Sequence, residues 1–150
     1  MISTVQKTIT DLERIGDEAK KIAKTAKQLH TTGSNFTPQI RLAHIATAVV
    51  DMLRTSLDAY ARLDTISAAQ VVRQDKEVDA EFKGIMRQLI TYMMEDPRTI
   101  SQSIELMFVA KSVERIGDHA KNIAEYVVYM VKGRDVRHTS LEEIEREATR

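Results

Sequence analysis

Apolar residues recur every three or four positions along nearly the whole chain, and polar residues fill the positions between them. This spacing places apolar side chains on one side of an α-helix. No stretch alternates in the manner of a β-strand, and only five Gly and two Pro interrupt the 150 residues. The sequence therefore predicts an all-α protein. Its first helix covers about residues 2–31, with the stripe Ile2, Val5, Ile9, Leu12, Ile15, Ala19, Ile22, Ala26 and Leu29.

Three further helices follow. Thr37-Pro38 and Asp96-Pro97 each combine a capping residue with proline, which is typical of helix starts, and Gly33 and Gly133 are placed to end helices. We expect helices from Thr37 to about residue 63, from a break at 64–67 to about residue 95, and from Asp96 to about residue 132. Their stripes centre on Ile45 and Val49, on Val78 and Ile85, and on Val113 and Ile123.

Long helices joined by short turns predict an up-down three-helix bundle over residues 37–133. The helix within residues 1–32 is extra, and residues 134–150 form a charged tail in which Ser140 and Glu143 are placed to cap a short helix. The apolar stripe of the first helix needs a partner, because an isolated stripe of this length is a large exposed patch. We expect it either to pack on its own bundle or to pair with a second copy of the chain.

A duplicated motif links the first and last helices. Glu13-Arg14-Ile15-Gly16-Asp17 recurs as Glu114-Arg115-Ile116-Gly117-Asp118, and nine of sixteen positions are identical between residues 11–26 and 112–127. A repeat of this length indicates a duplicated structural unit. The first helix is therefore expected to be the last helix of an equivalent, incomplete bundle. A glycine within each copy, which costs about 0.5–1 kcal/mol relative to alanine, indicates close approach of another helix or a ligand.

The motif carries paired carboxylates four residues apart, which lie on one side of a helix and repel each other. The pairs are Glu13/Asp17 and Glu114/Asp118, and the third helix adds Asp75/Asp79. If the third and fourth helices are neighbours, Asp75, Asp79, Glu114 and Asp118 converge, on a solvent face or groove outside the core. Four oxygen ligands favour hard or borderline cations such as Mg, Mn, Ca or Fe. The alternative is an ordinary solvated helix face, with Arg14 and Arg115 in surface ion pairs.

Composition narrows the function classes. The 22 basic and 22 acidic residues balance, which disfavours nucleic-acid binding, and the absence of Cys excludes disulfides and thiol chemistry. No apolar run has the length of a membrane span, and no signal peptide is recognisable, so we expect a cytoplasmic protein. No catalytic motif is evident, and His44, His119 and His138 are interpreted as solvated or hydrogen-bonded rather than catalytic. The chain is expected not to be an enzyme.

These motifs resemble the PhoU family, whose members regulate bacterial phosphate uptake. The resemblance rests on both Glu-Arg-Ile-Gly-Asp copies, on residues 75–79, on residues 92–96 and on residues 132–138, and it covers about residues 1–138. It implies two similar three-helix bundles, of which this chain matches only the later part, beginning inside the third helix. The expected N-terminal truncation leaves the first bundle without its first two helices.

The resemblance also implies a function. Family members repress phosphate-starvation genes when phosphate is plentiful, by linking the ATPase subunit of the phosphate ABC transporter to a sensor histidine kinase. A homodimer, membrane association only through these partners and indirect sensing of phosphate are expected. Family metal motifs correspond to Asp75/Asp79 with Glu114/Asp118, and to Glu13/Asp17, with Fe, Mn or Mg as the expected cations. The alternatives are a carboxylate-based metal sensor or store, and an inactive helical fragment that self-associates.

Overall fold

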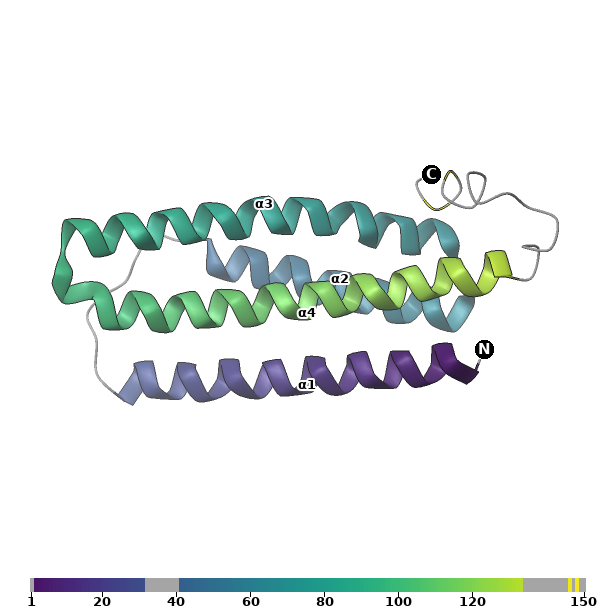
Figure 1. Cartoon of the computed structure of the whole chain (residues 1–150), viewed down its shortest axis with the longest axis horizontal. Helices are drawn as coiled ribbons and strands as arrows, with labels where there is room; N and C mark the ends of the chain where they lie inside the picture. Colours follow the sequence, from purple (N-terminus) through teal and green to yellow (C-terminus); the bar gives the residue numbers. More distant parts are fainter. Residues whose placement is uncertain (1, 32–40, 134–145, 147, 149–150) are drawn as a thin grey trace.

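A computed structural model describes residues 2–31, 41–133, 146 and 148. Within these ranges the chain forms α1 (Ile2–Thr31), α2 (Leu42–Arg62), α3 (Thr65–Glu95), the 3-10 helix η1 (Pro97–Thr99) and α4 (Ile100–Gly133), with no strand (Figure 1). The predicted all-α fold is confirmed. None of the helices in the described part of the chain has both the length and the hydropathy needed to cross a bilayer.

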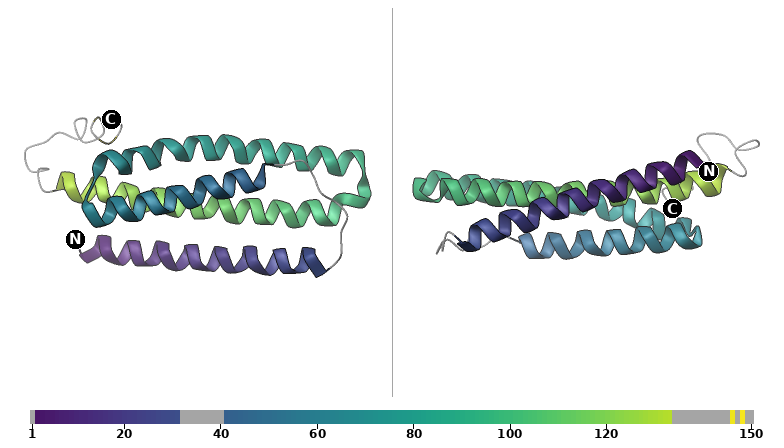
Figure 2. Two further views of the ribbon diagram at one scale, coloured as in Figure 1. Left: turned by 180° about the vertical axis from the view of Figure 1, so that it is seen from behind. Right: turned by 90° about the horizontal axis from the view of Figure 1, so that it is seen from below.

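The helices lie side by side in an elongated molecule. α2, α3 and α4 pack against one another as the predicted bundle, and α1 runs along α4 on the side away from α3 (Figures 1 and 2). The N-terminal end of α1 lies beside the C-terminal end of α4, so these two helices are antiparallel. α4 is therefore the central helix, which contacts all three others.

The bundle core is formed by the stripes that the sequence predicts. Ile45, Val49 and Met52 come from α2, and α3 and α4 supply the other large buried side chains, among them Val71, Val78, Ile85, Leu89, Val113, Ile123 and Val127. Burying each such side chain contributes roughly 1.5–3 kcal/mol. This apolar core fixes the positions of α3 and α4, and with them the polar side chains on the edges of those helices.

The turn between α2 and α3 is shorter than the predicted break at 64–67. Leu63 adopts a left-handed conformation with φ of 54°, and Asp64 immediately caps α3 by accepting hydrogen bonds from the backbone N–H groups of Ile66 and Ser67. An aspartate cap of this kind satisfies N–H groups that the first helical turn leaves without partners. Ser67 therefore belongs to the first turn of α3, not to the break.

The other predicted helix boundaries agree with the structure in part. Asp96 ends α3, and its carboxylate accepts from the N–H of Arg98 at the start of η1, so the Asp96-Pro97 signal is confirmed with one 3-10 turn before α4. α2 begins at Leu42 after Arg41, whose side chain makes no capping bond. The predicted start at Thr37-Pro38, the Gly33 end and the capped segment at Ser140 and Glu143 lie outside the described residues.

α1 packs on its own chain, partly through Ile15 and Ile22 of its apolar stripe but mostly through polar residues. The side chains that α1 buries are Thr4, Thr8, Asp11, Ile15 and Glu18, four of them polar. Ile2, Val5, Ile9 and Leu12, which the sequence analysis assigned to a buried stripe, are exposed. That assignment was wrong for this half of the helix, because α4 presents polar side chains to α1 and these select the polar flank of α1.

Candidate functional site

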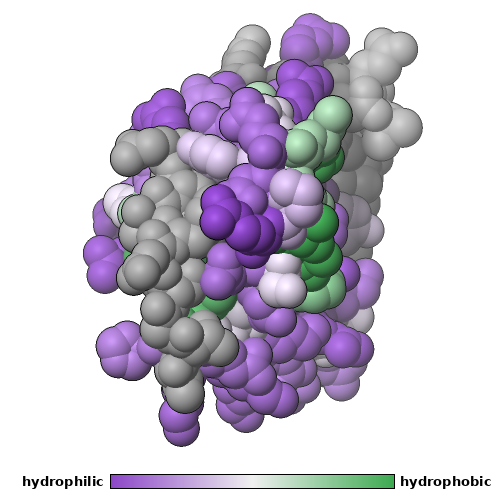
Figure 3. Space-filling model, turned by 90° about the vertical axis from the view of Figure 1, so that its left-hand side faces the viewer, coloured by the Kyte–Doolittle hydropathy of each residue, from purple (hydrophilic) through white to green (hydrophobic). Residues whose placement is uncertain are grey.

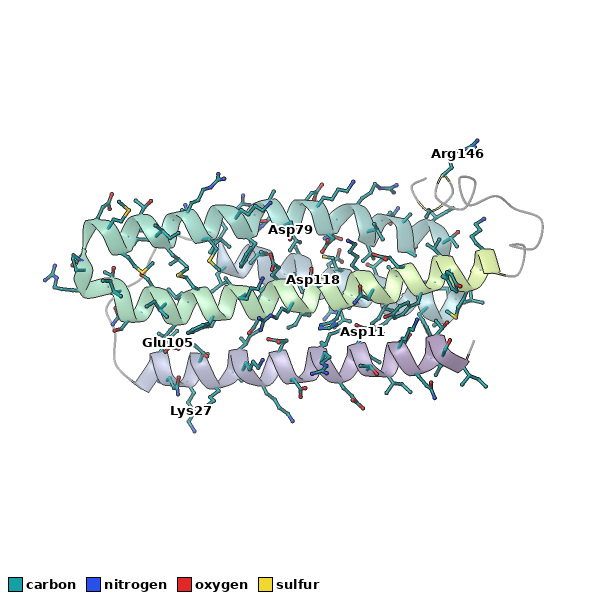
Figure 4. The ribbon with its side chains drawn as sticks, in the orientation of Figure 1. Asp11, Lys27, Asp79, Glu105, Asp118 and Arg146 are labelled. Carbon is teal, nitrogen blue, oxygen red and sulfur yellow. The ribbon has the colours of Figure 1, made fainter. Side chains whose placement is uncertain are left out.

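Asp11 is the centre of a polar cluster between α1 and α4. Its Oδ1 lies 2.7 Å from Nδ1 of His119 and accepts a 3.2 Å hydrogen bond from Nδ2 of Asn122. Asp11 itself is buried, and its position between the two helices is visible in Figure 4. Burial and a hydrogen bond to Asp11 raise the pKa of Tyr126 to about 12. The cluster joins α1 to α4 through groups that are 108 or more residues apart.

Glu18 forms a second polar contact two turns along α1. Its Oε1 lies 3.3 Å from Nζ of Lys21 and 3.6 Å from Nη1 of Arg115, and Ser112 also hydrogen-bonds to it. Burial raises the pKa of this carboxyl, but the hydrogen bonds from Ser112 and Lys21 and the charges of Lys21 and Arg115 lower it more. The net result is a pKa below the ordinary value, so Glu18 remains a carboxylate at neutral pH.

These two contacts are related by the repeat. The two copies are offset by 101 positions, so Asp11 corresponds to Ser112 and Glu18 corresponds to His119. Asp11 contacts His119, and Glu18 contacts Ser112. The α1–α4 pair therefore has an approximate two-fold relation in which each copy of the motif meets the other.

The predicted α3–α4 carboxylates occupy the other side of α4. Asp75 is buried, and Nζ of Lys121 lies 3.7 Å from its Oδ2. Burial raises the pKa of Asp75, and the charges of Asp118, Asp79 and Glu114 raise it further, against the lowering effect of Lys121. The four acids therefore influence one another electrostatically, as groups at one site do.

Asp118 and Glu114 lie one turn apart on α4. The pKa of Asp118 is raised by partial burial of its carboxyl and by the charge of Asp79. Figure 4 places Asp118 and Asp79 beside each other between α3 and α4. Glu114 is buried, and its carboxylate accepts a 2.7 Å hydrogen bond from Lys111, whose ammonium lies 5.3 Å from the centre of the Phe82 ring. The expectation of a solvent face or groove outside the core holds for Asp118, which is exposed, and was wrong for Glu114, which is buried and paired with Lys111.

Lysines, not further acids, complete this arrangement. Lys111 lies against Glu114, and Lys121 lies against both Asp75 and Glu125, which is one way to reduce the repulsion among acids on adjacent helices. Among the described residues, no three His, Asp or Glu side chains are placed so that together they hold a metal ion. As they stand, these side chains have the chemistry of a hard-cation site but not its geometry.

Glu13 and Asp17 are not part of either cluster. Both are exposed on α1, which runs along α4 on the side away from α3 and so away from the α3–α4 acids. The two motif copies therefore have different surroundings. A side chain at Gly117 would place its Cβ 3.4 Å from Cγ2 of Val49, whereas nothing lies within 4 Å of the corresponding position at Gly16.

The sequence analysis missed the α1–α4 cluster. His119 was interpreted as a hydrogen-bonded histidine, which its contact with Asp11 confirms, and His44 likewise lies 2.7 Å from Glu81. Asn122, one turn beyond Asp118 on α4, faces Asp11 of α1. A signal is present in the sequence, since Thr4, Thr8, Asp11 and Glu18 follow helical spacing on a flank beside the apolar stripe.

Comparison with known families decides the identity of this arrangement. A family model described as the PhoU domain matches residues 42–127, which include α2, α3 and most of α4. The chain belongs to the PhoU family. The resemblance recognised from the motifs is thereby confirmed, and the central helix with its Glu-Arg-Ile-Gly-Asp motif lies within the matched region.

Curated PhoU relatives match almost the entire chain. A phosphate-specific transport system accessory protein PhoU homolog from Pseudomonas aeruginosa is 47% identical over 147 residues, which is 98% of this chain and 61% of the relative. The phosphate-specific transport system accessory protein PhoU of Escherichia coli is 44% identical over 97% of this chain and 60% of the relative. The chain thus spans about three-fifths of the length of these relatives.

A solved structure supports the same fold. The crystal structure of PhoU from Pseudomonas aeruginosa superposes with a TM-score of 0.85 and 48% sequence identity, covering 88% of this chain and 63% of that one. The helices of this chain are therefore arranged as in the matched part of that PhoU structure.

Proposed function

We propose that this chain is an accessory regulator of phosphate-specific transport. The observation that carries the proposal is its identity of 44–47% to proteins named as phosphate-specific transport system accessory proteins, over 97–98% of the chain. In this proposal it acts without enzymatic activity, as an adaptor in the cytoplasm. Its partners are the ATPase subunit of the phosphate ABC transporter and a sensor histidine kinase, and phosphate-starvation genes are repressed when phosphate is plentiful.

The character of the surface supports an adaptor. The long helices present exposed charged residues of both signs along their outer faces, and rim charges of this kind steer association with partners and set its specificity. We further propose that the chain is a homodimer that reaches the membrane only through these partners.

The adaptor role is tested by binding and by regulation. The purified 150-residue chain is expected to co-purify with the transporter ATPase subunit and with the kinase. In cells that lack their own accessory regulator, it is expected to restore repression of a phosphate-starvation reporter in high phosphate. Absence of binding to both partners, together with an unrepressed reporter, would reject the adaptor role for this chain.

A second proposal is cation binding by the α3–α4 carboxylates. The observation that favours it is the raised pKa of Asp75 and of Asp118, caused by burial and by neighbouring acids, because a cation among these groups relieves the repulsion. Asp75, Asp79, Glu114 and Asp118 are the candidate ligands, and an ion would take the place that the Lys121 ammonium holds beside Asp75. Fe, Mn and Mg suit these oxygen donors.

Elemental mass spectrometry separates the two proposals. Stoichiometric metal in the wild-type chain after loading, and none in a Glu114→Ala, Asp118→Ala double variant, is the expected result for a cation site. Reporter repression that survives the double substitution would show that the adaptor role is independent of metal. Absence of metal from both the wild type and the double variant would reject the cation site and leave lysine as the partner of these carboxylates.

A further inference from the structure

Asp75 is a buried acid in a protein whose charged side chains lie mostly on the surface. Hydrophilic side chains cover most of the end of the molecule where α3 meets α4, for example (Figure 3). Asp75, by contrast, is buried between these helices. It comes close to α4 because Gly117 has no side chain, and its Oδ1 lies 4.0 Å from where a Cβ of Gly117 would be. A carboxylate in such a position needs a positive charge or hydrogen-bond donors beside it.

Lys121 supplies this positive charge. Its Nζ lies 3.7 Å from Oδ2 of Asp75. Burial raises the pKa of both Asp75 and Asp118, and the charge of Lys121 lowers the pKa of both, so one ammonium group acts on acids of α3 and of α4. A side chain of the protein therefore holds the position that a bound cation would take among these acids.

The two lysines of this arrangement are not held equally. The acids that they neutralise are Asp75, Asp79, Glu114 and Asp118. Lys111 lies 2.7 Å from Glu114, and its ammonium lies 5.3 Å from the centre of the Phe82 ring, which adds a cation–π attraction. Lys121 has the longer contact, so it is the lysine that an incoming cation displaces more easily.

Lys121 also has a second acid within reach. Its Nζ lies 3.8 Å from Oε1 of Glu125, one turn further along α4, which is nearly the same distance as to Asp75. The side chain of Glu125 is 53% exposed and that of Asp75 is 10% exposed. The lysine stem is flexible, and a turn of its end toward Glu125 frees the space beside Asp75 while the ammonium keeps an acidic partner.

We propose that Lys121 is a tethered competitor for the α3–α4 carboxylates, which turns to Glu125 when a divalent cation enters. This inference rests on the proposed cation site and adds to it the residue that decides how tightly the site holds an ion. The ammonium and the ion exclude each other, because like charges repel strongly at this range and both need the oxygens of Asp75. The apparent affinity for the ion is therefore reduced by the fraction of molecules in which Lys121 occupies the site.

Manganese binding to the 150-residue chain tests the competition. Electron paramagnetic resonance of free Mn²⁺ gives the dissociation constant of each variant. Lys121→Met is expected to bind Mn²⁺ roughly tenfold more tightly than the wild type, because the opposing charge is gone. The matched control is Lys76→Met, which removes the same charge from an exposed position next to Asp75 and should change the affinity much less. Circular dichroism should show equal helix content in all three chains.

Glu125→Gln tests the second position of the ammonium. It is expected to weaken Mn²⁺ binding in the wild-type background, because Lys121 then stays beside Asp75. In a chain that already carries Lys121→Met it should have no effect, and this non-additivity measures the coupling between the two residues. Equal weakening in both backgrounds would show that Glu125 acts only as a general negative charge, and would overturn the movement of Lys121.

Thermal unfolding gives a readout that does not depend on measuring free ion. Without metal, Lys121→Met is expected to melt at a lower temperature than the wild type, because the buried Asp75 has lost its partner. Added Mn²⁺ should raise the melting temperature of this variant more than that of the wild type, since tighter binding to the folded form stabilises it more. Equal melting temperatures with and without Mn²⁺ in both chains would contradict the proposal.

The outcomes distinguish this inference from the cation site on which it rests. Mn²⁺ binding by the wild type that Lys121→Met leaves unchanged would overturn the competitor role and keep the cation site. Binding by Lys121→Met but not by the wild type would support the competitor role and reject a filled site in the unaltered chain. Absence of binding from every variant would reject both.

Discussion

Gly117 illustrates how one missing side chain positions two helices. An added Cβ at this position would lie 3.4 Å from Val49 and 3.9 Å from Val78, so even a methyl group would be in van der Waals contact with both side chains. We expect Gly117→Leu to lower the free energy of unfolding by about 1–3 kcal/mol through overpacking. Gly84→Leu on α3 is the matched control, since no atom lies within 4 Å of that Cβ position. Urea denaturation of both variants measures the difference, and equal stability would show that α2 and α4 separate easily.

Glu18 makes the stability of the protein depend on pH in a defined direction. Its pKa is lower in the folded chain than its ordinary value of 4.5, so the folded form binds the proton less readily than the unfolded form. The resulting stability is present above pH 4.5 and is lost as the pH falls through the folded pKa. At pH 7 we expect Glu18→Gln to be less stable than the wild type by about 1.5 kcal/mol, the lower end of the range for a hydrogen bond to a charged group.

The measurement is a series of urea titrations between neutral and acidic pH. The difference between the wild type and Glu18→Gln should shrink as the pH falls below 4.5, because the wild-type carboxylate then becomes protonated. Glu77→Gln, an exposed acid on α3, is the control and should behave as the wild type at every pH. A difference that stays constant down to low pH would assign the effect of Glu18→Gln to packing instead of charge.

At the scale of an element, α1 is attached through polar contacts. Asp11 accepts from Asn122 and meets His119 at 2.7 Å, and removal of a buried charged partner leaves both of these groups unsatisfied. We expect Asp11→Ala to cost about 1.5–3 kcal/mol in the attachment of α1 and to leave the α2–α3–α4 bundle folded. Hydrogen exchange of the α1 amides measures this loss. Thr10→Ala, on the exposed side of the same helix, should leave the exchange unchanged.

The elements themselves were largely predictable from the sequence. Apolar residues at helical spacing located the four helices, and Asp96-Pro97 marked the turn between the last two, because these signals act locally. The flank of α1 that faces α4 was not predictable in this way. Its residues Thr4, Thr8, Asp11 and Glu18 are polar, and they are buried only because His119, Ser112 and Asn122 meet them from a distant part of the chain.

The α3–α4 carboxylates were likewise predictable only in part. The i, i+4 spacing placed Asp75 with Asp79 and Glu114 with Asp118, and packing of α3 on α4 brings the two pairs to one side of α4. The roles of Lys111 and Lys121 did not follow from spacing, because the reach of a lysine depends on the orientation of both helices. Metal binding by these acids, and by Glu13 and Asp17, stays a prediction.

At the scale of the whole molecule, stability should be uneven. α2, α3 and α4 share an apolar core, whereas α1 joins them through α4 and leaves its apolar flank exposed. Regions with few buried apolar contacts open at lower free energy than the core. Native-state hydrogen exchange is expected to show the α1 amides opening well before those of α3 and α4. A single common opening free energy for all four helices would show that the molecule unfolds as one unit.

The order of the helices along the chain has a consequence for protein synthesis. α1 leaves the ribosome before α4, and its contact residues on α4, such as His119, follow Asp11 by 108 positions. At a translation rate of about 5–20 residues per second, α1 waits roughly 5–20 seconds before its partner helix exists. During that interval both its polar flank and its apolar flank are open to solvent. A nascent chain of this protein therefore offers chaperones an amphipathic helix until α4 has been made and packs against it.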